Sequence, residues 1–481
     1  MARPFTTVRD PVKGLVRTIR TSMTYGVIVG SRGGFPHKLA KKGHDDMIEV
    51  LQGLGHNVVI LSEDDTPNGA VETLADAKKC AALFQQHASE IDGIIVTLPN
   101  FGDEKAIANA LRWSAIDVPV IVHAEPDVIE LMVRGERRDS FCGKISVCNN
   151  LNQYNIPFTL TAQHTCPVSG EDFKEEIEYF TAVCRVVNGL KNARLGAIGA
   201  RPAAFNTVRY SEKLLESAGV SVETLDLSEI IATVQAMDDA DERVTQRLEG
   251  VRSYVDTGPV SEEGLVKIAK LAVAVEDWIE ANDLDAIAFQ CWSSIEKNLG
   301  VAPCAMLSML SNNLIPGACE VDVTGALTML ALALASGTSA AILDWNNNYG
   351  DDPDKAVAFH CSNLPADMLC NPVMDHHFSE NFERGCAFGT IFGRVASGPF
   401  TYARITTNDE VGEVSYYTGE GEFTDDPLET FGGYAVMDIP GLQELLQEIC
   451  IMGYEHHFAA TKGNVSHILE EAFEYLDINQ V

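Results

Sequence analysis

The chain of 481 residues lacks the long apolar run of a membrane-spanning helix and the leader of an exported protein. Its longest apolar stretch, residues 326–341, is interrupted by Thr328 and by the polar and glycine residues at 336–339, whereas a membrane helix needs about 18 or more apolar residues in a row. The N-terminus carries scattered charges and no apolar signal-peptide core. None of the twelve cysteines is arranged as CxxC, so reduced thiols and a cytoplasmic location are expected.

Basic residues are also scarce. The chain has 35 Lys and Arg against 69 Asp and Glu, a formal net charge of -34 at pH 7. Phosphate binding needs a basic surface, which excludes nucleic acid and anionic membranes as partners. A few arginines that line a pocket can still bind an anionic sugar. The hydrophobic content of 46% is ordinary for a packed globular protein, and the length suggests about three domains.

Two common catalytic and cofactor motifs are missing. There is no GxSxG sequence, which argues against a serine hydrolase. The turn at residues 29–38 reads VGSRGGFPHK and is not GxGxxG, and Ser62 stands where a ribose-binding acid is expected after the second strand, so nicotinamide binding is disfavoured. Glycines in this turn let a ligand approach the backbone. Arg32 and His37 in the same turn suit sugar hydroxyls or an anionic substituent.

What is present is an α/β pattern followed by a β-rich region. Short Val- and Ile-rich segments alternate with amphipathic segments, which is typical of parallel sheets covered on both faces by helices. Beyond Asn346, glycine and aromatic residues become dense and alternating segments appear, which favours antiparallel strands in a barrel-like arrangement with helices. The predicted domains are two flavodoxin-like or Rossmann-like domains at 1–165 and 166–345 and a C-terminal β domain at 346–481.

Two acidic residues in the second domain follow apolar segments. Glu320 ends the segment that begins at Ile315, and Asp344 ends the segment that begins at Ser339, with a helix predicted over 324–336 between them. Ligands bind at the carboxyl ends of strands in open α/β sheets, and a β-α-β connection brings two such ends to one edge. Acids that abut buried strands are costly unless they bind something. A single one is usually a cap or an ion-pair partner, but the matched pair predicts a site.

Histidines supply further ligands for that site. His360 follows Asp344 by 16 residues, and His456 and His457 stand together near the C-terminus. Carboxylates together with imidazole suit Mn²⁺, Co²⁺, Fe²⁺ or Mg²⁺. Any one histidine taken alone is as readily a buried structural residue.

Several segments together resemble the L-fucose isomerase and L-arabinose isomerase superfamily. The resemblance covers most of the chain, in order, and the Glu, Asp and His combination with its spacing is specific. The matching segments are QCW at 290–292, LGVAPC at 299–304, ACEVD at 318–322, LDWN at 343–346, FHCSN at 359–363, HH at 456–457, and GARP at 199–202 with Phe205.

The resemblance implies a role for each matching residue. Glu320 and Asp344 resemble the two carboxylates that hold Mn²⁺ and act as the acid and base. His457 is favoured over His456 as the third ligand, because it precedes a stretch of small residues, and His360 resembles an additional ligand. Gln290 resembles a substrate-contacting glutamine, and substrate contacts are likewise expected of residues in the matching segments, namely Trp292, Trp345 and Asn346.

Arg32 resembles a first-domain arginine that reaches into the active site of a neighbouring subunit. A homo-oligomer, a trimer or hexamer with shared active sites, is therefore expected. The chain is much shorter than the fucose enzymes, and relatives of this length include isomerases of modified sugars, sulfoquinovose among them. Arg32, His37 and Lys38 are the predicted sulfonate contacts in that case.

The predicted reaction is an aldose–ketose isomerisation in which a proton moves between C1 and C2 of the sugar through an enediol. A divalent metal, most simply Mn²⁺, stabilises the charge that develops on two oxygens while carboxylates shuttle protons. Two alternatives are open. One is a sugar-binding protein without catalysis, since tandem α/β domains also form sensors, and the other is a metal-dependent aldolase or epimerase with the same ligands.

Overall fold

The computed structural model describes residues 3–133, 135–376 and 387–480. The chain divides into two compact units, one formed by residues 1–4 and 20–188 and the other by residues 5–19 and 189–481. Each unit is described by itself, and the predicted boundaries at 165 and 345 stay a prediction. A search of the described residues finds no helix with the length and apolarity that crossing a membrane requires.

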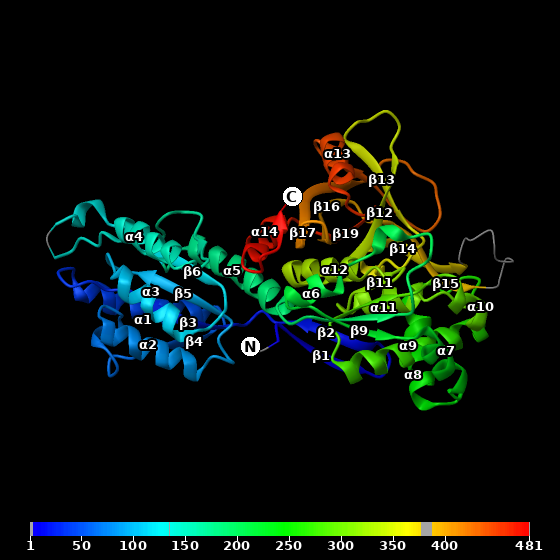
Figure 1. The fold of residues 1–481 in the computed structure, drawn as a ribbon, viewed down its shortest axis with the longest axis horizontal. Helices are drawn as coiled ribbons and strands as arrows, with labels where there is room; N and C mark the ends of the chain where they lie inside the picture. Colours follow the sequence, from blue (N-terminus) through cyan, green and yellow to red (C-terminus); the bar gives the residue numbers. More distant parts are fainter. Residues whose placement is uncertain (1–2, 134, 377–386, 481) are drawn as a thin grey trace. The chain divides into compact units, whose positions relative to one another are not determined.

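The first unit contains a five-stranded parallel sheet, drawn in blue to green in Figure 1. Its strand order is β4-β3-β5-β6-β7, which is the flavodoxin order 2-1-3-4-5. The strands are β3 (Thr24–Val29), β4 (Asn57–Ile60), β5 (Gly93–Leu98), β6 (Val120–Ala124) and β7 (Thr159–Leu160). The helices are α1 (His37–Gly53), α2 (Leu74–Gln86), α3 (Glu104–Ser114), α4 (Ser140–Gln153) and α5 (Glu171–Leu190), with short 3₁₀ turns at Pro67–Gly69 and Ile129–Leu131.

Helices cover both faces of this sheet because neighbouring strand residues point to opposite sides. Ile94 and Val96 of β5 pack into one apolar core with residues of α2, α3 and α4. Ile95 of the same strand packs into a second core with residues of α1 and α5. The Val- and Ile-rich runs of the sequence are therefore buried on both sides, as predicted for a parallel sheet.

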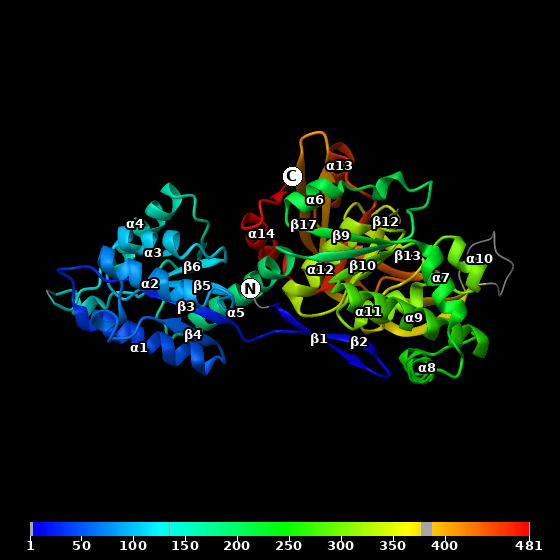
Figure 2. The same cartoon turned by 60° about the horizontal axis from the view of Figure 1, so that its bottom comes forward.

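The second unit contains a parallel sheet of its own and a short hairpin from the N-terminus. The sheet has the order β11-β10-β8-β9, and the hairpin pairs β1 (Phe5–Asp10) with β2 (Gly14–Ile19). The sheet strands are β8 (Arg194–Ile198), β9 (Ser221–Leu225), β10 (Ala286–Phe289) and β11 (Gly317–Cys319). The helices around it are α6 (Glu212–Ser217), α7 (Leu227–Ala236), α8 (Glu242–Tyr254), α9 (Glu262–Asn282), α10 (Ser294–Leu299), α11 (Cys304–Asn312) and α12 (Val323–Ser336). In Figure 2, α12 is drawn beside β10 and α6 above β9.

The rest of the second unit is a nine-stranded mixed sheet. Six of its strands pair antiparallel in a closed ring, in the order β18-β13-β12-β19-β16-β17 and back to β18. The strands are β12 (Ala340–Asn348), β13 (Lys355–His360), β14 (Leu369–His376), β15 (Phe388–Val395), β16 (Gly398–Asn408), β17 (Glu413–Thr424), β18 (Gly433–Asp438), β19 (His457–Lys462) and β20 (Asn479–Gln480). Two helices, α13 (Leu442–Met452) and α14 (Ser466–Glu474), and 3₁₀ turns at Asn206–Val208 and Ala366–Met368 complete the unit.

The α/β class with two parallel sheets followed by mainly antiparallel strands is confirmed, and one local prediction is wrong. Asp344 does not end a strand of the second parallel sheet. It lies inside β12, the strand that follows α12. This strand pairs with β13 and β19 in the antiparallel ring and is not part of the parallel sheet.

Candidate metal centre and active site

The turn that carries Glu320 has an uncommon backbone. The parallel strand β11 ends at Cys319, and the next two residues, Glu320 and Val321, have positive φ angles of 59° and 57°. A left-handed conformation is unfavourable for non-glycine residues, and for β-branched valine it is a true outlier. Such strain persists only where the surrounding structure enforces it, and it collects at functional sites. Here it accompanies a Glu320 side chain that is almost completely buried.

Antiparallel pairing brings Asp344 to the same place. In the ring, Asp344 of β12 lies opposite His457 of β19 on one side and opposite Phe359 of β13 on the other. His360 follows Phe359 at the end of β13. Cross-strand neighbours in antiparallel sheets lie about 5 Å apart, so the register places the Asp344 carboxylate beside the His457 imidazole, and His360 lies at the end of the other neighbouring strand.

One histidine nitrogen lies close to both carboxylates. Nε2 of His457 is 3.0 Å from Oε2 of Glu320 and 3.4 Å from Oδ1 of Asp344. Nε2 of His360 is 3.9 Å from the same Glu320 oxygen. The predicted acidic pair thus converges on a shared point, but Glu320 comes from the end of the parallel strand β11 and Asp344 from the antiparallel ring, not from two strand ends of one parallel sheet.

Asp322 fixes the orientation of His457. Nδ1 of His457 donates to Oδ2 of Asp322 at 2.8 Å, and that carboxylate also accepts two hydrogen bonds from Arg404, at 2.6 and 2.9 Å. Neither Asp322 nor Arg404 has any exposed side-chain surface. A carboxylate that holds Nδ1–H leaves the Nε2 lone pair free to bind a cation, which is the usual support of a histidine ligand.

The pKa values in this cluster follow from burial and from these contacts. Burial opposes ionisation of Asp322, but Arg404 and His457 outweigh it and hold its pKa well below the usual range. Burial likewise lowers the pKa of His457, yet the neighbouring carboxylates of Asp322 and Glu320 raise that pKa to about 10. For Asp344, burial is the main cause of a raised pKa. The carboxylates and histidines of this cluster therefore lie close together in a largely buried site, where their charges influence one another's pKa values.

The donor set fits a divalent cation. Oε2 of Glu320 is buried and has no hydrogen-bond partner among the described residues, although Nε2 of His457 lies 3.0 Å away. Two groups of side chains have ligand atoms within 4.8 Å of one another, namely Glu320 with His360 and Cys361, and Asp344 with His456 and His457. Carboxylate oxygens and imidazole nitrogens suit Mn²⁺ and related ions, and a cation would satisfy the unpartnered oxygen.

His456 differs from His457. Its side chain is 41% exposed and its Nε2 lies 3.7 Å from Oδ1 of Asp344. Burial, followed by the neighbouring His457, lowers its pKa to about 4, so it is neutral near pH 7. Its ring stacks on Phe205, which also makes an edge contact with Trp292. The three rings form an aromatic border on the open side of the carboxylates, which suits the apolar faces of a sugar.

Gln290 and the loop after β8 lie at this border. Oε1 of Gln290 accepts from the backbone N–H of Ala200 at 2.9 Å, and Nε2 donates to the carbonyl of Trp292 at 3.0 Å. A Cβ on Gly199, which has a φ of +81°, would lie 2.4 Å from Oε1 of Gln290. Glycine is required there for both reasons.

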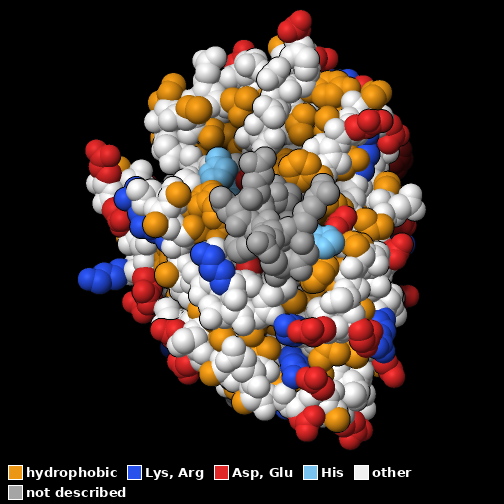
Figure 3. All heavy atoms as spheres, turned by 90° about the vertical axis from the view of Figure 1, so that its right-hand side faces the viewer, with side chains coloured by type: hydrophobic (Ala, Val, Ile, Leu, Met, Phe, Trp, Pro, Cys, Tyr) orange, Lys and Arg blue, Asp and Glu red, His pale blue; other side chains and the backbone are white. Residues whose placement is uncertain are grey.

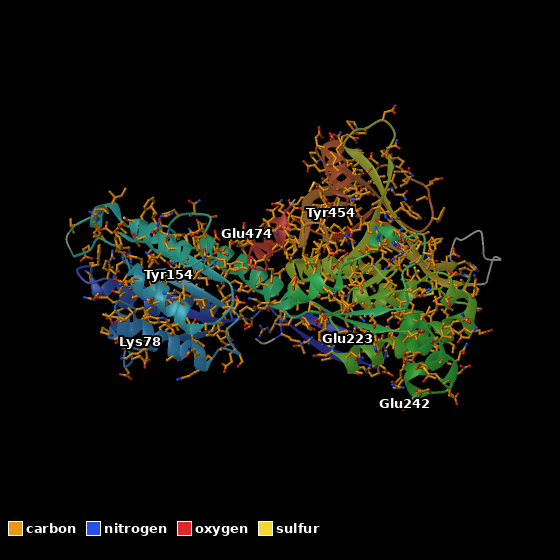
Figure 4. The ribbon with its side chains drawn as sticks, viewed as in Figure 1. Lys78, Tyr154, Glu223, Glu242, Tyr454 and Glu474 are labelled. Carbon is orange, nitrogen blue, oxygen red and sulfur yellow. The ribbon has the colours of Figure 1, made fainter. Side chains whose placement is uncertain are left out.

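Trp345 and Asn346 follow Asp344 along β12. Trp345 stacks on Phe458 with ring centroids 4.3 Å apart and donates to the Tyr417 hydroxyl at 3.0 Å. Tyr417 in turn packs edge-on against Tyr454, which Figure 4 labels. The exposed Asn346 has its side chain 3.3 Å from that of Asn347.

Arg32 and His37 belong to the first unit. Arg32 pairs with Glu104 at 2.5 Å and its guanidinium lies 4.5 Å from the centre of the Phe101 ring. Nδ1 of His37 is 3.9 Å from a Glu72 oxygen. Lys38, the other basic residue of this turn named from the sequence, forms an ion pair with Glu136.

Sequence reasoning missed the supporting residues of the centre. Asp322 was overlooked although it stands two positions after Glu320. Arg404 lies in the middle of β16, where both faces of the strand are buried. A charged residue among buried strand residues is the sequence feature that could have indicated its role. The buried thiols of Cys291, Cys304 and Cys361 all act on the pKa of the buried Cys319, so these cysteines also gather here. The cysteines of the described residues are all free, as expected.

Comparison with known proteins shows that the chain is similar to sugar isomerases. The model of the fucose/sulfoquinovose isomerase N-terminal domain matches residues 26–191, and that of the L-fucose isomerase C-terminal domain matches residues 358–481. A sulfoquinovose isomerase of Priestia aryabhattai is 25% identical over 390 residues, which cover 79% of this chain and 83% of the relative. A sulfoquinovose isomerase of Alkalicoccus urumqiensis is 26% identical over 409 residues, which cover 83% and 88%.

Proposed function

Since the chain belongs to the fucose/sulfoquinovose isomerase family and is an aldose–ketose isomerase, we propose that it interconverts a sulfonated aldose, sulfoquinovose or a close analogue, and the corresponding ketose at the Glu320–Asp344 centre. Membership of this family sets aside the non-catalytic sugar-binding protein. The substrate rests on the relatives, whose names specify sulfoquinovose.

One observation carries the assignment of the centre. The two carboxylates approach the same nitrogen of His457, and the Glu320 oxygen beside it is buried without a hydrogen-bond partner among the described residues. An unpaired buried carboxylate oxygen costs several kcal/mol by order of magnitude. That cost is understandable if Glu320, Asp344 and His457 hold a divalent cation, most simply Mn²⁺, with His360 and His456 adjoining it.

The chemistry moves one proton between adjacent carbons. For the aldose, the proton on C2 is removed, a proton is delivered to C1, and the hydroxyl proton on O2 moves to O1, which leaves the ketose. We assign the two proton transfers to Glu320 and Asp344. A bound divalent cation would supply positive charge to stabilise the oxyanion character that develops on O1 and O2.

Protein groups prepare these steps. Asp322 holds the ring of His457, and burial keeps the carboxylates in a low-dielectric environment where their charges act strongly. The raised pKa of Asp344, caused mainly by burial, brings that carboxyl closer to the range in which a group both accepts and donates a proton. Gln290, Trp292 and His456 border the open side and are assigned to sugar contacts, together with Trp345 and Asn346 further along β12.

The remaining parts of the proposal concern assembly. We propose a cytoplasmic homo-oligomer, a trimer or hexamer, in which Arg32 and His37 of one subunit contact the sugar bound by another. The resemblance of Arg32 to the arm of the superfamily supports this, and the free thiols of the described residues suit a reducing compartment.

The test is isomerisation in D₂O. Purified protein is stripped with a chelator, reloaded with Mn²⁺ and incubated with sulfoquinovose, and the product is analysed by NMR. A ketose that carries solvent deuterium at C1, formed only after metal is restored, is the expected result. An aldose inverted at C2 would point to an epimerase, cleavage to shorter fragments would point to an aldolase, and an unchanged sugar would refute the proposed substrate.

A further inference from the structure

A pocket of about 240 Å³ lies at the carboxyl end of β8, next to the candidate metal centre. It is bounded by the loop that follows β8, by β9 and by Val321, the residue after Glu320. Two arginines from the loop, Arg201 and Arg209, line it together with Tyr210. Neither the family models nor the names of the relatives assign any role to this pocket.

Neither of the two arginines has an acidic partner in the described part of the chain. The recorded hydrogen bonds of their side chains go to backbone carbonyls, from Arg201 to Pro202 at 3.3 Å and from Arg209 to Asn206 at 2.8 Å. Within the described residues, no carboxylate pairs with either guanidinium. Glu223 on β9, labelled in Figure 4, is paired instead with Arg194 at 2.8 Å.

Unpaired arginines are unexpected in this chain. Acidic residues outnumber basic ones by 69 to 35, and acidic side chains are spread around the edge of the face shown in Figure 3. Two guanidinium groups that line one pocket repel each other unless an anion lies between them. Their planar forks suit the oxygens of a sulfonate or phosphate, and guanidinium is the side-chain group most used for such recognition.

The pocket is connected to the reacting end of the site by short contacts. The backbone of Ala200 is held by Gln290, whose amide also holds the carbonyl of Trp292. Phe205, in the same loop as the arginines, packs on Trp292 and on His456. The loop therefore extends from the arginines to the aromatic border beside the carboxylates. A sugar with a reactive end and a charged end requires a site with this arrangement.

From this arrangement we infer that Arg201 and Arg209 form the subsite for the sulfonate of the substrate and set the preference for a sulfonated over a neutral sugar. The inference rests on the proposed function for the identity of the sugar. It replaces Arg32, His37 and Lys38 as the predicted sulfonate contacts, because each of those faces a carboxylate of its own unit.

The test compares two substrates in the Mn²⁺-loaded enzyme. For Arg201→Gln and Arg209→Gln, the KM for sulfoquinovose should rise about tenfold or more, since each change removes a charge-assisted contact. Turnover number should change less, and kcat/KM for 6-deoxyglucose, which lacks the sulfonate, should stay within about twofold of the unmodified enzyme, because a neutral sugar has no sulfonate contact to lose. Arg243→Gln is the matched control, because Arg243 pairs with Asp277 on the surface of the same unit. An unchanged KM for sulfoquinovose in both loop variants would overturn the inference.

A binding measurement separates this inference from the proposed reaction. Calorimetric titration of the metal-free protein with sulfoquinovose reports the subsite without turnover. If the unmodified protein binds this sugar but does not isomerise it, and the loop variants lose binding, the subsite stands and the proposed reaction fails. If the unmodified protein isomerises the sugar and the variants bind it equally well, the subsite fails and the reaction stands.

Glucose 6-phosphate tests the type of anion. In sulfoquinovose the sulfur is bonded directly to C6, whereas a phosphate monoester has an ester oxygen between C6 and phosphorus, so its anionic group lies one atom further from the ring and fits a subsite shaped for the sulfonate less well. Sulfoquinovose should therefore bind more tightly. Tighter binding of glucose 6-phosphate that depends on the same arginines would overturn the assignment to sulfonate.

Discussion

In each of the two parallel sheets, a segment with basic residues follows the strand that comes first in the chain, β3 in one sheet and β8 in the other. The two segments differ in what surrounds those basic residues. After β3, Arg32 pairs with Glu104 and Lys38 with Glu136. After β8, Arg201 and Arg209 have no acidic partner among the described residues. An arginine that is already neutralised offers little net attraction to an anion, so an equivalent position in the fold does not imply equivalent chemistry.

The two sheets also differ in whether the buried polar side chains near their other strand ends are fully hydrogen-bonded. In the second unit, β11 leads into the strained turn at Glu320 and Val321, beside a buried carboxylate–histidine cluster. In the first unit, the buried His123 is satisfied by Thr97 and by the carbonyl of Cys166, and burial lowers its pKa to about 4. A neutral, fully bonded histidine is structural. The comparison predicts that substitutions in the second unit affect chemistry and affinity most strongly.

The largest effect is expected from Glu320→Gln. The substitution keeps the size of the side chain but removes the charge and the ability to transfer a proton, so turnover should fall at least about a hundredfold. Steady-state kinetics with sulfoquinovose measures the loss, and circular dichroism checks that the fold is retained. Activity within about threefold of the unmodified enzyme would contradict the assignment of this residue.

The next largest effect is expected from Asp322→Asn. Loss of the carboxylate that holds Nδ1 of His457 should weaken Mn²⁺ binding by about 10- to 100-fold, as is usual when the support of a histidine ligand is removed. Metal titration measures this directly. It should also lower thermal stability, since the buried Arg404 would lose one of its two carboxylate partners, Asp322 and Glu455.

A second buried aspartate provides the control for stability. Asp285 is buried, lies 3.8 Å from Arg17 and accepts a hydrogen bond from the backbone of Arg194, away from the candidate metal centre. Asp285→Asn should lower thermal stability but leave Mn²⁺ affinity unchanged. Equal losses of metal affinity in the two variants would show that Asp322 acts only through the stability of the fold.

The parts of the fold that depend on local pattern could be predicted from the sequence. Apolar runs such as that of β5 imply strands buried on both faces, and the glycines after β3 imply a strand-to-helix turn. The location of β12 could not be predicted. Its apolar residues suit either a parallel sheet or an antiparallel ring, and only pairing with the distant β19 decides between them.

The candidate site was predicted in part for a related reason. Glu320 and Asp344 stand out as acids beside apolar residues, and their convergence was expected from a connection that β12 does not make. Arg404 lies 82 residues from Asp322 in the chain, and a single sequence carries no sign that the two interact. Whether the basic residues at 32–38 are neutralised is equally hidden, because Glu104 and Glu136 come from other parts of the first unit.

A moderate effect is expected from Arg32→Gln. If Arg32 contacts sugar hydroxyls in a neighbouring subunit, its loss should raise the KM by about three- to tenfold, the cost of one or two hydrogen bonds. The increase should be the same for sulfoquinovose and for 6-deoxyglucose, because hydroxyls are common to both. A larger increase for the sulfonated sugar would show that the first unit, and not the loop after β8, recognises the charge.

The smallest effect is expected from Lys38→Gln, which tests the comparison from the other side. Lys38 is exposed and paired with Glu136, so its charge is screened by water and by its partner, and the KM for sulfoquinovose should change by less than about twofold. Steady-state kinetics at low and at physiological ionic strength measures it. A tenfold increase that disappears at high salt would mean that the ion pair opens to bind the substrate, so pairing in the free protein would no longer distinguish the two loops. A small change in KM at both ionic strengths would mean that the paired Lys38 does not contribute to binding of the sulfonate. The loops after β3 and β8 would then differ in function because their basic residues differ in charge pairing, and Arg201 and Arg209 would be the residues that bind the anion.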